Sequence, residues 1–268
     1  MTVHASDMPL ADAARGSAAT GRVVVLTDIT ELQRTIELRT DFVANASHEL
    51  RTPLATICAA VETLLTMDLT AEKPAAEQFL EKIARQGQRL QQMVSDLLDL
   101  SRLASPAERF EPEELDVGRL IDDLHDRFAA ALERKGLHWE TGVEPRDFVT
   151  IRANPQLLRL VLDNLVDNAV KFTKPGGHVG VYMRGTAGET RIEVRDDGCG
   201  IPSEDRERVF ERFYQVQRSR SGPERGTGLG LSIVRHAVTA LQGAVRLESE
   251  PGRGTRVLVT VPQRAAPS

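Results

Sequence analysis

The sequence predicts an α+β protein in which a helical hairpin precedes an α/β sandwich. Residues 32–65 and 79–100 repeat apolar side chains in steps of three and four, the period of a bundle helix. From residue 113 onward, short β-branched runs alternate with longer amphipathic segments, which is typical of a sheet covered by helices. The 268 residues are enough for two domains.

The first thirty residues predict a leader without regular structure, followed by a short strand and the start of a helix. Residues 1–20 are rich in Ala, Ser, Thr and Asp without sustained periodicity, so we expect a flexible leader. Residues 21–26 form a β-branched run typical of a strand, and Thr30 with Gln33 forms a capping-box pattern that begins a helix.

The helical hairpin is expected over residues 31–105. Its first apolar stripe consists of Val43, Ser47, Leu50, Leu54, Ile57, Val61 and Leu64. After a break over residues 66–74, the second stripe consists of Phe79, Ile83, Gln86, Leu90, Met93, Leu97 and Leu100. Two helices leave too much of these stripes exposed, so we expect a second copy to complete a four-helix bundle as a homodimer. The alternative is a linker hairpin that packs on its own chain.

The second domain is expected over residues 113–263, after a linker over 105–113 and before a tail over 264–268. Its predicted helices are 117–133, 155–172 and 229–241, and its predicted strands are 137–141, 148–151, 178–184, 191–195, 245–250 and 256–261. Strands joined by short turns around long helices indicate an α/β sandwich.

Composition argues against several classes of function. The 34 Lys and Arg residues against 39 Asp and Glu give a net charge of −5, and aromatic residues make up only 4%, so binding to nucleic acid is disfavoured. Cys58 and Cys199 lack the paired spacing of a disulfide framework or a zinc site, which fits a reducing cytoplasm. No run approaches the ~20 apolar residues of a membrane helix, so we expect no membrane contact in this chain, although an anchor could precede it.

A possible nucleophile lies on the first helix. His48 follows the stripe position Ser47 by one residue, about 100° around the helix, so its imidazole should face outward. Because imidazole titrates near neutrality, it carries an available lone pair at pH 7, and the adjacent Glu49 could accept its proton. Pro53 is expected to bend the helix near the histidine. The alternative is an ordinary surface histidine beside an acid.

Three further motifs suit a bound nucleotide. Asn164, Asn168 and Lys171 share one helical face, where amide oxygen suits magnesium and ammonium suits phosphate; the alternative is a solvated polar face. Residues 196–201 and 226–232 are glycine loops that allow close backbone approach, and the second opens a helix whose N-terminus suits phosphate. Alone, each loop could be a tight turn. Between them, residues 215–225 are expected to form a mobile lid whose arginines, including Arg220, reach the terminal phosphate.

Together and in this order, the motifs over residues 21–263 resemble the sensor histidine kinases of two-component signalling. The segment 42–54 resembles the family's phosphoacceptor box. The resemblance implies His48 as the phosphorylated residue, Glu49 as its base and Thr52 as a residue that positions water in a phosphatase reaction. Residues 21–30 resemble the end of a PAS sensor, although a whole PAS domain needs on the order of 100 residues. The phosphate-regulon type of sensor is the most similar subfamily.

The resemblance also implies a Bergerat-type ATP-binding domain that uses ATP and Mg²⁺. The implied roles are Asn168 on magnesium, Asn164 beside it, Lys171 on phosphate, Phe172 along the adenine pocket, Asp196 on the adenine amino group, Gly198 and Gly200 shaping that pocket, and Gly226, Gly228 and Gly230 at the phosphates, with Leu229 in the same loop. Asp163 and Asp167 receive no role.

The implied reaction is phosphoryl transfer from ATP to His48, and then to an aspartate of a response regulator receiver domain. The implied location is the cytoplasm, or the cytoplasmic part of a membrane-anchored protein. An ATPase of the chaperone, topoisomerase or mismatch-repair type would share the nucleotide motifs but would not need the His-Glu-Leu-Arg-Thr-Pro run on a bundle helix. A scaffold without activity would be expected to have lost some of these residues, and all are present.

Overall fold

A computed structural model describes residues 2–10, 19–27, 30–68, 72–104, 111–186, 188–216 and 226–263. Contacts divide the chain into two units, Met1–Glu49 and Leu50–Ser268, and each unit is described by itself. The predicted tail over 264–268 and most of the predicted linker over 105–113 lie outside the described residues.

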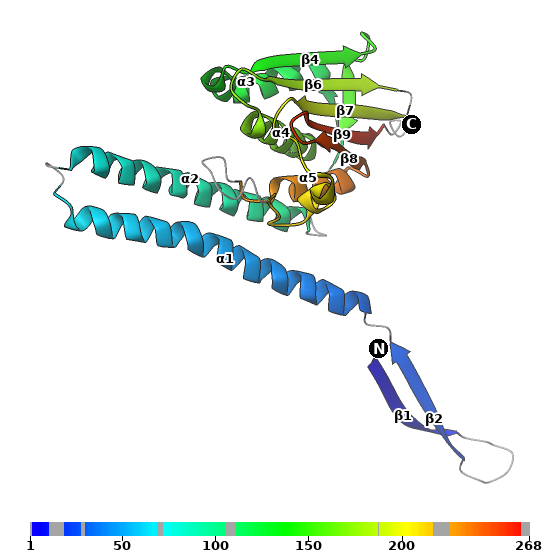
Figure 1. Ribbon diagram of the computed structural model, residues 1–268. Helices are drawn as coiled ribbons and strands as arrows, with labels where there is room; N and C mark the ends of the chain where they lie inside the picture. The colour runs from blue at the N-terminus through cyan, green and yellow to red at the C-terminus, as the bar shows by residue number, and fades with distance from the viewer. Residues whose placement is uncertain are drawn as a thin grey trace. The chain divides into compact units, whose positions relative to one another are not determined.

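The first unit begins with a β-hairpin and leads into a helix (Figure 1). Strand β1 (Thr2–Leu10) pairs antiparallel with β2 (Ala19–Thr27), so the prediction of a leader without regular structure is wrong for Thr2–Leu10. The predicted strand at 21–26 is confirmed and extended. A lone β-branched strand would leave its backbone groups without ladder partners, and residues 2–10 supply them despite their weak pattern.

Two long helices follow. Helix α1 (Thr30–Thr66) and helix α2 (Lys73–Leu103) confirm both predicted helical segments and extend them by a few residues. Pro74 lies in the first turn of α2, where its missing N–H costs no helical hydrogen bond. Within the second unit the two helices expose large apolar side chains at Leu54, Val61, Leu65, Leu80, Val94 and Leu98. The four-helix bundle that would cover them stays a prediction.

The remainder of the second unit is a two-layer α/β sandwich, as predicted, with the helices on one face of the sheet (Figure 1). The sheet has the order β4-β6-β7-β9-β8, with β4 parallel to β6 and the other pairs antiparallel. Its strands are β4 (His138–Glu144), β6 (His178–Gly185), β7 (Glu189–Asp196), β8 (Ala244–Glu250) and β9 (Gly254–Pro262). The helices are α3 (Val117–Lys135), α4 (Pro155–Phe172) and α5 (Gly230–Ala240).

A second, two-stranded sheet stands at the start of this domain. Strand β3 (Glu113–Asp116) pairs antiparallel with β5 (Thr150–Ala153). The predicted linker therefore ends too late, because Glu113 already belongs to a strand. A four-residue strand carries too little periodicity to be distinguished from a loop in sequence. Two short 3₁₀ helices, η1 (Ser203–Asp205) and η2 (Arg208–Phe210), precede the predicted lid.

The core fixes the orientation of α4. Asn154 caps the helix, its side chain accepting from Leu157 N at 2.9 Å, and Pro155 occupies the first turn. The buried residues of α4 face the inner side of the sheet; they are Leu157, Leu158, Val161, Leu162, Leu165, Val166, Ala169 and Val170. Burying aliphatic side chains of this kind contributes roughly 1.5–3 kcal/mol each, so the helix cannot rotate without exposing them. The remaining face of α4 is therefore held where it borders the cavity described next.

Candidate functional site

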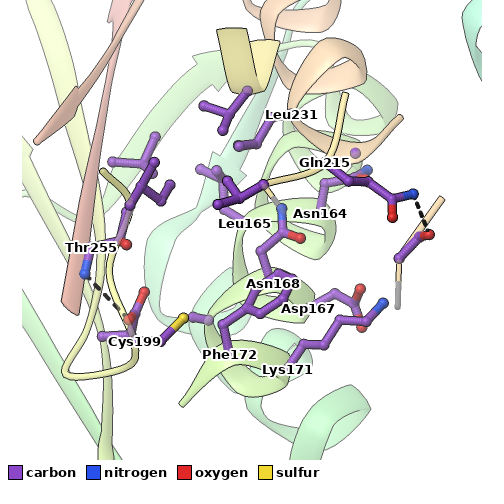
Figure 2. Close-up of a pocket in the computed structure, with 18 of the residues that line it drawn as sticks. Asn164, Leu165, Asp167, Asn168, Lys171, Phe172, Cys199, Gln215, Leu231 and Thr255 are labelled. Carbon is purple, nitrogen blue, oxygen red and sulfur yellow. Dashed lines mark hydrogen bonds between the residues drawn. The ribbon is translucent and has the colours of Figure 1, made fainter. Parts of the chain in front are cut away.

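A cavity of about 520 Å³ lies between α4, the loop after β7 and the loop before α5 (Figure 2). The predicted nucleotide residues that line it are Asn164, Asn168, Lys171, Phe172, Asp196, Gly200, Gly226, Gly228 and Gly230. Three motifs that are far apart in sequence thus meet at one site. Arg220 and the rest of the predicted lid over 217–225 lie outside the described residues.

The predicted polar face of α4 borders the cavity, and its first member closely approaches the glycine loop. Asn164 Nδ2 donates to Leu160 O at 2.8 Å, which orients the amide. A Cβ at Gly230 would lie only 3.0 Å from Asn164 Oδ1, and a Cβ at Gly226 would lie 3.5 Å from Lys171 Nζ. The amide oxygen and the ammonium group thus lie beside the backbone of the loop.

The end of α4 is held by a residue that the sequence analysis missed. Lys135, in the last turn of α3, donates from Nζ to the carbonyl oxygens of Val170 at 3.0 Å, Lys171 at 2.7 Å and Thr173 at 3.3 Å. A cation at a helix C-terminus is favoured by the helix dipole. This contact fixes the turn that carries Lys171 and Phe172 into the cavity.

Asp196 ends β7 and supplies a carboxylate to the cavity. Its Oδ1 accepts from Gly198 N at 2.9 Å and from Thr255 N at 3.3 Å (Figure 2 shows Thr255). Burial raises the pKa of Asp196 to about 6, although these two backbone donors act in the opposite direction; the neighbouring Asp197 carboxylate also raises it. Both bonds go to Oδ1, so Oδ2 is the oxygen that can accept a hydrogen bond from a ligand.

The first glycine loop lets the backbone come close to its neighbours. A Cβ at Gly198 would lie 2.5 Å from Phe172 O, and a Cβ at Gly200 would lie 2.0 Å from Glu250 O. Gly200 lines the cavity, whereas Gly198 is buried behind it. Gly198 therefore shapes the site through the Asp196 turn rather than as part of its wall.

The cavity walls around the Asp196 carboxylate are apolar, and none of their residues had a predicted role. They include Leu165, Val194, Ile201, Val209, Leu231, Leu247 and Val257. In sequence these residues are indistinguishable from ordinary core positions, so no local signal could have separated them. An apolar slot with one acceptor at its end suits a planar base that carries an amino group.

The second glycine loop leads directly into α5. Gly228 has φ +74°, and a Cβ there would lie 2.7 Å from the carbonyl carbon of Phe213, so the position needs glycine. α5 begins at Gly230, which places its N-terminus and unpaired N–H groups at the cavity. Leu229 is fully buried below the loop and does not line the cavity.

The loop is also bonded to α2, which the sequence analysis did not foresee. Thr227 Oγ1 donates to Asp96 Oδ2 at 2.6 Å and accepts from Leu229 N at 3.2 Å. Gln92 Nε2 donates to Asp96 Oδ1 at 2.8 Å. Asp96 is only 4% exposed, and burial raises its pKa despite these donors. Gln92 and Asp96 both reach the cavity.

The predicted phosphoacceptor lies on α1. His48 is exposed, as predicted, Glu49 is half-buried, and Thr52 is exposed one turn further along the helix. Pro53 lies inside α1 and is buried; the bend expected there stays a prediction.

Among the described residues, no group of three or more His, Cys, Asp or Glu side chains could hold a metal ion. A Mg²⁺ ion at this site would therefore depend on few protein ligands, such as Asn168, together with phosphate oxygens. That is the usual arrangement for Mg²⁺ at nucleotides. In the same part of the chain, no helix is both long and apolar enough to cross a bilayer.

Comparison with known families decides the assignment. Residues 38–106 match the His Kinase A (phospho-acceptor) domain, and residues 153–265 match the histidine kinase-, DNA gyrase B- and HSP90-like ATPase family. The chain belongs to the sensor histidine kinases. The phosphoacceptor match favours the histidine kinases over the other ATPases that the second family includes.

Named relatives agree with this assignment. The kinase is 35% identical to the sensor-like histidine kinase SenX3 of Mycolicibacterium smegmatis and 35% identical to the sensor histidine kinase WalK of Bacillus subtilis, over 91% of its own length in each case. It spans 63% of the SenX3 sequence and 40% of the WalK sequence. The solved structure of full-length ShkA in complex with AMPPNP is 29% identical, with a TM-score of 0.60, over 85% of this chain and 47% of ShkA.

Proposed function

We propose that this histidine kinase phosphorylates His48 from Mg-ATP and passes the phosphoryl group to an aspartate of a response regulator. The observation that carries the proposal is that one chain holds both an exposed histidine in a phosphoacceptor domain and a cavity lined by the residues predicted to bind a nucleotide. Either feature alone would be compatible with a different function.

In the proposed complex, the adenine ring occupies the apolar slot beside Phe172 and Cys199. Its amino group donates to Asp196, the one acid that ends a strand at this wall of the cavity. The triphosphate extends toward the N–H groups at the start of α5, where the helix dipole favours negative charge. Lys171, close to Gly226, adds a positive charge at the phosphates. The ShkA structure is a complex with AMPPNP, which supports the binding of a nucleoside triphosphate by this chain.

Mg²⁺ would be held by Asn168, with Asn164 beside it, and when bound it neutralises charge on the phosphate oxygens. Asn168 and Asn164 both line the cavity from α4, one helical turn apart. Amide oxygens carry no charge. The phosphate oxygens of the nucleotide, rather than the protein, would therefore balance most of the positive charge of Mg²⁺.

The chemistry proceeds through one nitrogen of the neutral His48 ring. That nitrogen attacks the γ-phosphorus; a P–N bond forms as the bond from phosphorus to the β,γ-bridging oxygen breaks, and ADP leaves with the electron pair. Glu49 accepts the proton from the other ring nitrogen. In the second step an aspartate carboxylate of the receiver domain displaces His48 from phosphorus. Thr52, one turn further along, would position water when the kinase acts as a phosphatase.

The apolar side chains that α1 and α2 expose support a homodimer. Leu54, Val61 and Leu65 on α1 are 54%, 39% and 81% exposed in the single chain. Exposed apolar side chains that recur along one helix are typical of an interaction site, and an isologous four-helix bundle would bury them on both copies. The response regulator would then dock on a dimer.

The test is incorporation of label from Mg-ATP carrying ³²P in the γ position. We expect wild-type protein to gain acid-labile label, the signature of phosphohistidine, and His48→Ala to gain none. His138→Ala, which alters an exposed histidine outside the site, is the matched control and should label normally. Equal labelling of His48→Ala would contradict the role of His48, and binding of Mg-ATP without any labelling would contradict the kinase proposal itself.

A further inference from the structure

A histidine on α5 is locked in one neutral tautomer. His236 Nδ1 lies 2.7 Å from Ser232 O, and a carbonyl oxygen can only accept, so Nδ1 carries the hydrogen. His236 Nε2 lies 3.1 Å from Arg212 Nη2, and a guanidinium can only donate, so Nε2 offers its lone pair. The two hydrogen bonds independently require the same form of the ring.

We propose that neutral His236 is a positioning residue of the nucleotide site, which holds Arg212 and, through it, the segment 212–215 against the glycine loop. The proposal rests on the proposed binding of ATP in this cavity.

The segment anchored by Arg212 forms part of the cavity. Phe213, the next residue, has φ 63°, an unusual backbone conformation for a residue with a side chain, and its backbone touches Gly228. Tyr214 and Gln215 line the cavity, and Gln215 Nε2 donates to Gly226 O at 2.9 Å (Figure 2). The guanidinium of Arg212 therefore fixes a segment that touches the glycine loop at two points, Gly226 and Gly228. A residue in a strained backbone conformation persists only where its surroundings hold it. Arg212 is one of the residues that hold Phe213 in this conformation.

The surroundings of His236 oppose its protonation. The pKa of His236 is lowered chiefly by burial and then by the positive charges of Arg212 and Arg235, while the hydrogen bond to Ser232 acts in the opposite direction. Two charged side chains on elements that pack against α5 have partners of their own: Arg208 of η2 lies over the Tyr214 ring, and Asp96 of α2 is bonded to Thr227. A proton on Nε2 would place a second N–H donor against the guanidinium and break the contact.

Because the pKa of His236 is lowered, the contact between His236 and Arg212 depends on pH in a defined direction. His236 is protonated more readily in the unfolded chain than in the folded one, so the positioning contact is present at neutral pH and is lost as the pH falls through the lowered pKa. Asp196 titrates in a similar range, near pH 6, and its protonation also weakens adenine binding. A test must therefore separate the two groups.

His236→Gln achieves this separation. A glutamine oxygen can accept from Arg212 but cannot be protonated in this range, and the variant keeps Asp196 unchanged. His236→Ala removes the acceptor at every pH, and Arg212→Ala removes the donor from the other side. Both alanine variants break this contact, so each should weaken binding.

The experiment is calorimetric titration of the full chain with Mg-ADP from about pH 8 down to about pH 5, a range that brackets imidazole titration. At pH 8 we expect His236→Gln to bind within about twofold of wild type, and His236→Ala and Arg212→Ala to bind roughly tenfold more weakly, the effect of a lost charge-assisted hydrogen bond. As the pH falls, wild type should lose several-fold more affinity than His236→Gln. Nitrogen NMR of wild type should show a protonated Nδ1 and an unprotonated Nε2 at pH 8.

Parallel pH profiles for wild type and His236→Gln, or wild-type affinity in His236→Ala, would overturn the positioning role while leaving nucleotide binding intact. Absence of Mg-ADP binding by the wild type at any pH would instead overturn the proposed nucleotide site, and this proposal with it.

Discussion

The nucleotide cavity and the phosphoacceptor segment differ in how far their functional groups are open to solvent. In the cavity, Asp196 is bonded to two backbone N–H groups, Asn164 to a helix carbonyl and Thr227 to Asp96. On α1, His48 and Thr52 stand on the exposed surface of a helix. A site that binds one ligand benefits from fixed geometry, because the ordering cost is met during folding. A histidine that must meet both a nucleotide and a receiver domain needs an accessible surface instead.

The largest effect is expected from Asp196→Asn. Oδ1 of asparagine can keep the bonds from Gly198 and Thr255, but the amide places an N–H donor where the adenine amino group needs an acceptor. We expect Mg-ATP affinity to fall by roughly ten- to a hundredfold, the loss of a hydrogen bond to a charged group. Calorimetric titration measures this, with Asp197→Asn on the exposed neighbouring side chain as the matched control. Unchanged Mg-ATP affinity in Asp196→Asn would contradict the proposed hydrogen bond between the adenine amino group and Asp196.

The same substitution should stabilise the protein without nucleotide. A folded-state pKa of about 6 against an ordinary value of 3.8 means that the folded state binds more protons than the unfolded state between these values. The free energy of unfolding therefore falls as the pH rises across this window, by roughly 3 kcal/mol at most. Urea unfolding at pH 4 and pH 7.5 should show this loss in wild type and a smaller loss in Asp196→Asn. An identical pH dependence of the unfolding free energy in both proteins would contradict the destabilisation that we attribute to the buried Asp196 carboxylate.

Two glycines of the same loop provide the next contrast. Gly228→Ala should lower stability by about 1–3 kcal/mol and weaken nucleotide binding, because φ is +74° and the new Cβ would meet the Phe213 backbone at 2.7 Å. Gly226→Ala is the matched control, since its Cβ would meet Lys171 Nζ at an ordinary 3.5 Å. Thermal unfolding with and without Mg-ADP measures both effects. Equal losses of stability and of nucleotide binding in the two variants would contradict a special requirement for glycine at position 228.

The last of these effects is expected at the contact between α2 and the glycine loop, and it concerns stability alone. Thr227→Val removes the hydroxyl that donates to the buried Asp96, and we expect a loss of about 1–3 kcal/mol in unfolding free energy. Thr227→Ser keeps the hydroxyl and should lose less. Since Asp96 is then left buried without this donor, Asp96→Asn should partly rescue Thr227→Val. Chemical denaturation tests this series, and additive effects of the two substitutions would contradict their direct coupling.

Local patterns in the sequence predicted much of this site, because its main elements are regular. The spacing of Asn164, Asn168 and Lys171 places them on one helical face whatever the surrounding fold, and glycine at 228 and 230 marks the close approaches that the structure contains. His48 is exposed as expected, and the stripe positions Val43 and Ser47 are exposed as well, so its offset from the stripe stays a prediction.

The parts that were not predicted depend on contacts between distant residues. Asp96 and Thr227 are separated by 131 positions, and nothing near either residue indicates the other. Lys135 looks like any basic residue at a helix end, yet it bonds three carbonyls of another helix. Strand β1 was missed because its own pattern is weak and its stability comes from pairing with β2. Tertiary contact, rather than propensity, decides such features.

The most direct measurement of the central claim is to locate the transferred phosphoryl group. Wild-type protein is incubated with Mg-ATP, digested at neutral or alkaline pH to preserve phosphohistidine, and mapped by tandem mass spectrometry, with Asp196→Asn treated in parallel. We expect a phosphoryl group on His48 in wild type and a lower occupancy of His48 in Asp196→Asn at the same subsaturating concentration of Mg-ATP, although that variant keeps His48. A phosphoryl group on another residue, or equal occupancy of His48 in both proteins, would contradict the claim that the cavity phosphorylates this histidine.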